Sequence, residues 1–168
     1  VTSMQRRIAK AVNFGIIYGM GEYSLAKDLG ISVKEAREYI SNYFDKYRGV
    51  NQYMNSIIES TKESGYVETM FKRRRKITEI NSSNFMLRSA AERMTRNTPI
   101  QGSAADIIKI AMIDVEKRLR EEGLRSSLIL QIHDELIIEA YEDEVDKVKE
   151  ILKQSMENAA KLSVPLVA

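Results

Sequence analysis

Residues 6–19 read RRIAKAVNFGIIYG, and this stretch decides the fold of the first part of the chain. Its charged and aromatic side chains recur every four residues, as Arg6, Lys10, Phe14 and Tyr18. These positions share one broad face of a helix, and the row is roughly 18 Å long. Such a row suits a nucleoside triphosphate, because cations bind phosphate oxygens and aromatic rings stack on a base. An amphipathic helix with an aromatic core face explains the same spacing, and spacing alone favours that interpretation.

The residues around this row predict a helical region. We expect helices at about 3–18, 22–29, 32–47 and 50–64. Ser3 is a plausible N-cap for the first, and Ser32 with Glu35 forms a capping box for the third. Gly49 is expected to separate the last two helices, and Gly65 to end the fourth.

The second half of the chain mixes helices with strand-like segments. Short β-like runs are expected at 66–71 and 75–78, with the basic run KRRRK at 72–76 as a hairpin tip. A helical pattern follows at 84–122 and is interrupted near Pro99 and Gly102. We then expect a strand, a turn and a strand at 126–140, a helix at 143–162, and the start of another strand at the end. This order of elements predicts an α+β fold.

Composition limits the classes of protein that fit. The absence of Cys excludes disulfides and thiolate metal sites, and the presence of one His means that a metal site must depend on carboxylates. The sequence contains no long uncharged apolar run, so it predicts no membrane span. Residues 1–125 hold 22 Lys and Arg against 15 Asp and Glu, whereas residues 126–168 hold 4 against 9. This asymmetry is compatible with an anionic partner on the first part, and equally with chance scatter of surface charge.

The apolar runs LILQI and LIIEA flank His133, Asp134 and Glu135. Two apolar strands that rise to a polar tip give a rigid platform for a carboxylate, which phosphoryl transfer with divalent ions requires. A polar hairpin turn is the plainer interpretation. A metal-dependent hydrolase of the His-Asp type is a rival, but it needs further histidines, which the chain lacks.

The first stretch resembles the nucleotide-binding motif of family A DNA polymerases, R-R-x-x-K-x-x-N-F-G-x-x-Y-G, at every defining position. The resemblance implies that Arg6 and Lys10 hold the triphosphate of the incoming nucleotide, with Lys10 also catalytic. Phe14 would pack on its sugar and base, and Tyr18 would lie at the template side. Phe at residue 14 implies discrimination against nucleotides that lack a 3′-hydroxyl. The helix would belong to a mobile fingers subdomain that closes over a correctly paired nucleotide.

The same resemblance assigns roles to the acidic hairpin. Asp134 resembles the second catalytic aspartate, a ligand of one of two Mg²⁺ ions, and Glu135 would have an auxiliary catalytic role. His133 would approach the primer end.

Two further segments resemble DNA-facing parts of the family. The run with Arg73, Arg74 and Arg75 is similar to a basic run placed near duplex DNA, although Lys72 stands where the family usually has Gly. Arg93, Asn97 and Gln101 are four apart, so one helical face can present all three to minor-groove acceptors. Without the resemblance, a solvated cation cluster and a polar helix face are the ordinary interpretations.

The resemblance implies a mainly helical fingers region at 1–83 followed by part of an antiparallel-sheet palm at 84–168. The family's first catalytic aspartate lies in a strand motif upstream, which this chain does not contain, so we expect the chain to be part of a longer bacterial polymerase and inactive alone. Its partners would be primer–template DNA, deoxynucleoside triphosphates and the missing upstream parts, in a cytoplasmic, nucleoid-associated setting. A non-catalytic nucleic-acid-binding module and a helical structural domain without ligands remain alternatives.

Overall fold

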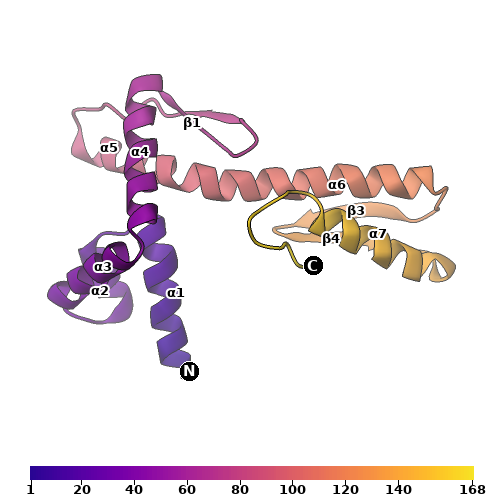
Figure 1. Ribbon diagram of the computed structural model, residues 1–168, viewed down its shortest axis with the longest axis horizontal. Coiled ribbons are helices and arrows are strands. Elements are labelled where there is room, and N and C mark those ends of the chain that lie inside the picture. The colour runs from indigo at the N-terminus through magenta and orange to yellow at the C-terminus, as the bar shows by residue number, and fades with distance from the viewer. The chain divides into compact units, whose positions relative to one another are not determined.

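The computed structural model describes residues 1–168, which fold into two compact units. The first unit comprises Val1–Gly102 and the second Ser103–Ala168 (Figure 1). Helices dominate both units, and each contains one two-stranded antiparallel sheet, so the predicted α+β class is confirmed. None of the helices is both long enough and apolar enough to cross a membrane.

Three helices form the first part of the first unit: α1 (Ser3–Ile17), α2 (Glu22–Leu29) and α3 (Val33–Lys46). The N-cap of α1 is Thr2 and not Ser3, because the Thr2 hydroxyl and the Gln5 side chain complete a capping box one residue earlier. The capping box of Ser32 and Glu35 is present as predicted. Buried Leu25, Ala26 and Ala36 form the core between these helices.

Helix α4 (Arg48–Ser64) follows α3 with only Tyr47 between them. The prediction that Gly49 separates the two helices is wrong, because Gly49 lies inside α4. The break occurs at Tyr47, whose φ of −112° and ψ of 58° leave the helical region. Gly65 ends α4 in the left-handed conformation, with a φ of 77°.

A small hairpin follows, made of β1 (Tyr66–Glu68) and β2 (Arg74–Lys76). The second strand was expected from residue 75 and Arg74 at the tip, but the strand begins one residue earlier, so Arg74, Arg75 and Lys76 form β2. They pair with Glu68, Val67 and Tyr66, in that order. The tip comprises residues 69–73, and Lys72 has a positive φ of 64° there. Buried Val67, Ile77 and Ile80 anchor the hairpin against Ala91.

Helix α5 (Phe85–Asn97) begins at the N-cap Asn84 and passes into the π-helical turn η1 (Thr98–Gly102). The interruption predicted near Pro99 and Gly102 is therefore confirmed, and it takes the form of a wider turn. Pro99 has no N–H group to donate to the carbonyl of Thr95, so the α-helical ladder cannot continue through it.

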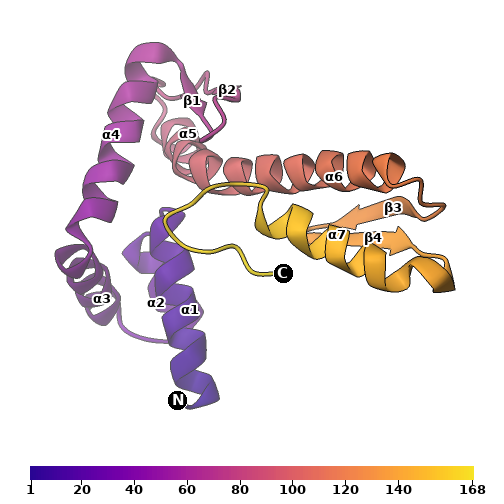
Figure 2. The same cartoon turned by 45° about the vertical axis from the view of Figure 1, so that its right-hand side comes forward.

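The second unit contains α6 (Ser103–Glu121), β3 (Ser127–Ile132), β4 (Glu135–Glu139), the short 3₁₀ helix η2 (Glu142–Glu144) and α7 (Val145–Glu157). Figure 2 shows α6 and α7 side by side, with the β3–β4 hairpin beside them. The core of the second unit contains Val115 of α6, Leu136 of β4 and Ile151 of α7. Arg118 and Asp114 of α6 also hydrogen-bond to Gln154 and Ser155 of α7.

The end of the chain differs from the prediction in two ways. Helix α7 ends at Glu157, earlier than the expected residue 162, and residues 158–168 contain no strand. A strand needs a neighbouring backbone to accept its hydrogen bonds, and no segment of this chain pairs with the last residues. Val164 and Val167 are accordingly exposed.

The β3–β4 hairpin has two different faces. Leu128 pairs with Ile138, whereas Leu130 pairs with Ile137, because a bulge lies between Leu128 and Leu130. Leu136 turns toward the helices and is buried. On the other face, Leu130, Ile132 and Ile137 remain 49%, 42% and 37% exposed, so one side of the sheet is an uncovered apolar surface.

Candidate functional site

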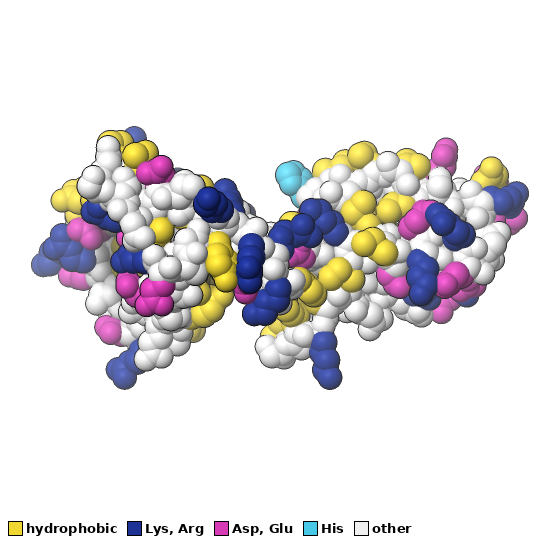
Figure 3. All heavy atoms as spheres, turned by 90° about the horizontal axis from the view of Figure 1, so that it is seen from above, with side chains coloured by type: hydrophobic (Ala, Val, Ile, Leu, Met, Phe, Trp, Pro, Cys, Tyr) yellow, Lys and Arg dark blue, Asp and Glu magenta, His cyan; other side chains and the backbone are white.

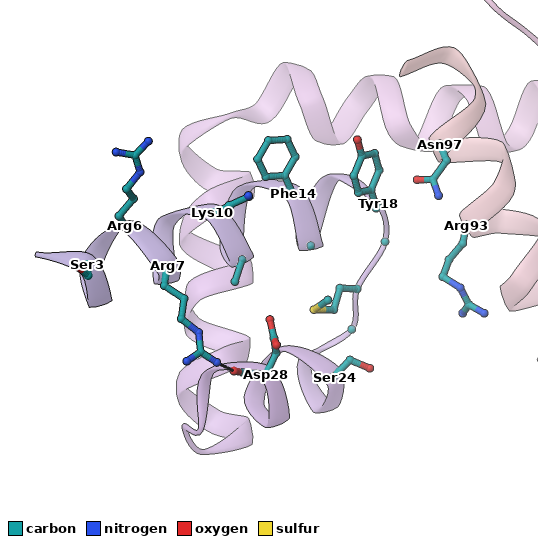
Figure 4. Close-up of a pocket in the computed structure, with 15 residues that line it drawn as sticks. Ser3, Arg6, Arg7, Lys10, Phe14, Tyr18, Ser24, Asp28, Arg93 and Asn97 are labelled. Carbon is teal, nitrogen blue, oxygen red and sulfur yellow. Dashed lines mark hydrogen bonds between the residues drawn. The ribbon is translucent and has the colours of Figure 1, made fainter. Parts of the chain in front are cut away.

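A cavity of about 1100 Å³ lies beside α1 in the first unit. Its walls come from three helices and include Arg6, Lys10 and Phe14 of α1 with the capping residue Tyr18, Ser24 and Asp28 of α2, and Arg93 and Asn97 of α5 (Figure 4). The structure therefore places all four residues of the predicted row on one cavity. It also adds residues of α2 that the sequence analysis did not single out.

The aromatic residues of the row face this cavity and not the protein core. Phe14 is 52% exposed, whereas the neighbouring Ile16 is 3% exposed and faces inward. The Phe14 and Tyr18 rings are stacked, with centroids 6.3 Å apart and planes inclined by 25°. The simpler interpretation, in which the aromatic residues form a core face, does not describe this helix. A flat apolar surface of this kind can contact a sugar or a base.

The start of α1 carries an excess of positive charge. Its first turn contains no acidic residue, and the side chains of Arg6 and Lys10 form no hydrogen bond or ion pair within the chain. Because the N-terminal end of a helix already carries partial positive charge, Arg6 near this end is unfavourable for the helix unless an anion approaches. The arrangement is electrostatically suited to phosphate groups.

Arg7 has a different role from its neighbour Arg6. In Figure 4 it points away from Arg6 and toward α2, where its guanidinium donates a hydrogen bond of 3.1 Å to the backbone carbonyl of Asp28. This bond ties α1 to the end of α2 and fixes one side of the cavity. The sequence motif names Arg7, but its partner could not be identified from spacing.

The C-terminal end of α1 is a Schellman motif, in which the N–H of Met20 donates to the carbonyl of Gly15 and that of Gly19 to Ile16. Gly19 has the required left-handed conformation, with a φ of 81°. A Cβ at Gly15 would lie only 3.1 Å from Sδ of Met20, so Met20 packs directly over Gly15. This tight ending places Tyr18 at the rim of the cavity.

A second cavity of about 370 Å³ lies where the basic hairpin meets η1, also within the first unit. It is lined by Arg73, Arg74 and Arg75 together with Asn97 and Gln101. The structure thus brings the two segments with predicted DNA contacts onto one surface.

The arginines of this surface are held by different contacts. The Arg74 guanidinium bonds to the Glu68 carboxylate at 2.9 Å and lies over the Tyr66 ring, 4.4 Å from its centroid. The hydrogen bond from Arg74 lowers the pKa of Glu68, which keeps this carboxylate charged. Arg75 contacts Sδ of Met94 at 3.5 Å.

Arg93, Asn97 and Gln101 do not line one common cavity, although their spacing predicted a shared face. Arg93 and Asn97 border the first cavity, and Asn97 and Gln101 border the second. Gln101 lies within the π-helical turn η1, whereas Arg93 and Asn97 lie in α5. Asn97 lies between both cavities, and its buried Oδ1 has no hydrogen-bond partner in the protein.

The acidic hairpin of the second unit has the predicted form. His133 and Asp134 make a two-residue turn between the paired residues Ile132 and Glu135, and His133 has a positive φ of 53°. The Gln131 side chain donates to the His133 carbonyl and stabilises this turn. Asp134 and Glu135 are exposed without an ion pair, as is His133, the only histidine, coloured cyan in Figure 3.

The acidic hairpin alone does not form a complete metal site. Asp134 and Glu135 offer oxygen ligands of the type that Mg²⁺ prefers. However, no group of three or more acidic or histidine side chains in the chain is arranged so that it could hold a metal ion. Any divalent ion held at Asp134 therefore needs ligands from outside these residues.

Comparison with known proteins identifies the family to which these two units belong. The model of DNA polymerase family A matches residues 1–168, and the chain belongs to this family.

Similar proteins include the DNA polymerase I of Streptococcus pneumoniae serotype 4, 50% identical over 168 residues, and that of Bacillus caldotenax, 54% identical over 166 residues. These matches cover 100% and 99% of this chain but 19% of each relative. The chain therefore spans about one fifth of the length of these relatives.

A solved structure is similar over nearly the whole chain. It is the POL domain of Pol1 from M. smegmatis in complex with DNA primer-template and dNTP. The two are 44% identical, with a TM-score of 0.94, and the match covers 99% of this chain and 29% of that chain.

Proposed function

We propose that this chain is part of a DNA polymerase that transfers nucleotides from deoxynucleoside triphosphates to a primer 3′ end. The observation that carries the proposal is the cavity lined by Arg6, Lys10, Phe14 and Tyr18, which are two unpaired cations followed by two stacked rings. The order of these groups along α1 matches the order of phosphate, sugar and base in a nucleotide. Family membership and the nucleotide-bearing relative from M. smegmatis support the same conclusion.

In this proposal Arg6 and Lys10 bind the triphosphate, and Lys10 also stabilises charge that develops during transfer. Phe14 packs on the sugar and base, and Tyr18 lies at the template side. Nucleotide selection by such a site depends on closure of the helix over a correctly paired base.

DNA contacts are proposed for the second cavity and its surroundings. Arg73, Arg74 and Arg75 would bind backbone phosphates, and Asn97 and Gln101, with Arg93, would contact minor-groove acceptors. The Asn97 amide NH₂ would donate to minor-groove acceptors, whereas its buried, unpartnered Oδ1 is an acceptor that would need a donor such as a water or the guanine amino group. Such a substrate would also place the protein at the bacterial nucleoid in the cytoplasm.

Asp134 is proposed as a metal ligand, with Glu135 in an auxiliary role and His133 near the primer end. Two Mg²⁺ ions would stabilise the charge of the transferred phosphate in the intact enzyme. Since the chain contains no complete ligand set, the remaining carboxylates must come from other parts of the polymerase. The 168 residues alone should therefore not extend a primer, and robust Mg²⁺-dependent incorporation by a clean preparation would contradict this.

The nucleotide role of α1 can be tested in an intact polymerase that contains this segment. Lys10→Ala should raise the KM for nucleotide by about 10- to 100-fold, the loss expected for a hydrogen bond to a charged group, with DNA affinity nearly unchanged. Lys27→Ala, an exposed lysine of α2 that does not line the cavity, is the matched control. Asp134→Ala should abolish turnover and leave DNA affinity nearly intact. If Lys10→Ala left nucleotide kinetics unchanged, the phosphate role would be wrong.

A non-catalytic nucleic-acid-binding module is the second candidate, favoured by the arginine-lined cavity that the first unit forms by itself. Both candidates predict salt-dependent affinity for primer–template DNA, because phosphate contacts release counterions. They differ in nucleotide binding, which only the polymerase requires. Lys10-dependent binding of a deoxynucleoside triphosphate to the primer–template complex of the intact protein separates them.

A further inference from the structure

The C-terminal end of α1 lacks a cation of its own. Its last turn contains no basic residue, although the free carbonyl groups there give a helix end partial negative charge. The helices α2, α3 and α4 each carry a lysine in the last turn, Lys27, Lys46 and Lys62. The end of α1 is thus electrostatically incomplete within its own sequence.

Arg96 of α5 lies directly against this end of α1. A Cβ added at Gly19 would lie 2.9 Å from Nη1 of Arg96 and 3.4 Å from its Cδ. Arg96 also lines a small cavity of about 210 Å³ together with Ile16, Gly19 and Met20, where α1 ends. The guanidinium therefore occupies the space that the missing side chain of Gly19 leaves open.

No other group neutralises Arg96 closely. Its side chain is only 23% exposed, and its one carboxylate partner, Glu92, lies at 4.0 Å, the outer limit of an ion pair. The amides of Asn51 and Asn55 across the cavity bond to each other at 3.2 Å. A largely buried guanidinium is stabilised by negative potential nearby, which the adjacent carbonyl end of α1 can supply.

We propose that Arg96 is a positioning residue for α1: it completes the charge balance at the C-terminal end of the helix and supports the left-handed turn at Gly19. By holding this end, Arg96 fixes the direction in which the Arg6 to Tyr18 row faces its cavity. The contact itself is independent of any ligand, whereas its importance for nucleotide binding depends on the proposed function.

The contact can be tested by amide hydrogen exchange on the complete 168-residue chain. Arg96→Met keeps much of the side-chain length and removes the charge, and Arg96→Lys keeps the charge. Arg120→Met is the matched control, because Arg120 also forms an i,i+4 ion pair with a glutamate but is 79% exposed on α6. Peptides covering residues 15–21 report on the end of α1, and peptides from α3 and α4 report on the rest of the unit.

Arg96→Met should speed exchange at residues 15–21 by about fivefold, as expected when a helix C-terminus loses a stabilising cation. Arg96→Lys should restore most of the protection, and Arg120→Met should leave it unchanged. Equal acceleration in α3 and α4 would indicate general destabilisation and overturn the proposal, as would unchanged exchange at residues 15–21.

A second measurement separates this proposal from the nucleotide role of the site. In the intact polymerase, Arg96→Met should raise the KM for nucleotide with little change in DNA affinity, and Arg96→Lys should recover it. Local exchange that changes without any change in KM would leave the contact established but refute its effect on the nucleotide site. Failure of Lys10→Ala to affect nucleotide kinetics would instead refute the proposed function.

Discussion

Gly102 is the position where a single added methyl group should have the clearest consequence. A Cβ at Gly102 would lie 2.8 Å from Cγ2 of Thr69, which is closer than real side chains pack. Thr69 is 4% exposed at the start of the hairpin tip, so it has little room to move. The contact determines how closely the basic hairpin approaches η1, and both line the arginine-rich cavity.

Two opposing effects set the size of the change. Gly102 ends a helical turn without a positive φ, so alanine there should by itself stabilise the fold by up to about 1 kcal/mol. Overpacking against Thr69 should cost about 1–3 kcal/mol. We therefore expect Gly102→Ala to lower the free energy of unfolding by about 1 kcal/mol, the difference between the typical values.

Thr69→Ser provides the matched partner for a double-mutant cycle. It removes the clashing methyl group and keeps the hydroxyl oxygen that accepts hydrogen bonds from the N–H groups of Phe71 and Arg73. Alone it should cost about 0.8 kcal/mol for the lost buried methyl. In the serine background Gly102→Ala should no longer destabilise, which gives a coupling energy of about 1–3 kcal/mol.

Urea unfolding followed by circular dichroism measures all members of the cycle, since the chain has no tryptophan for fluorescence. If Gly102→Ala had the same effect in the threonine and serine backgrounds, the close approach of Thr69 and Gly102 would not limit the structure.

Other perturbations test separate features. Ser126 and the backbone N–H of Arg125 hydrogen-bond to Glu144 and lower its pKa from 4.5 to about 2. The contribution of Glu144 to the stability of the second unit should therefore be complete above pH 4.5 and be lost as the pH falls toward 2. Glu144→Gln should weaken this acid dependence of thermal unfolding. Ser32→Ala removes a capping box and should cost about 1 kcal/mol in urea unfolding, whereas Ser32→Thr should cost much less. Gly65→Ala, in open space but at a φ of 77°, should cost about 1 kcal/mol, whereas Gly49→Ala inside the same helix should be neutral or stabilising.

Local signals in the sequence predicted much of the fold. The capping box at Ser32 and the glycine at 65 correctly marked helix ends, because each depends on a few adjacent residues. The hairpin around His133 was predicted from two apolar runs. Gly49 misled the prediction because glycine tolerates a helix as well as a break, and only the backbone angles at Tyr47 decide between them.

The candidate site was less completely predictable. The row on α1 followed from a period of four residues, and the cavity that it lines is present. The bond from Arg7 to the Asp28 carbonyl and the contact of Arg96 with Gly19 join segments far apart in sequence, so spacing gave no sign of them. The interruption near Pro99 was predicted, but its π-helical form, and the separate cavity that Gln101 lines, were not.

The uncovered side of the β3–β4 hairpin has a practical consequence for handling this chain. An exposed apolar surface is formed by Leu130, Ile132 and Ile137. It lies beside the edges of a two-stranded sheet, whose outer backbone groups can hydrogen-bond to another strand. Two such molecules can stack or add strands to one another, so the purified chain should self-associate as its concentration rises. Leu130→Lys should reduce this self-association, because it places a charge on the exposed apolar surface.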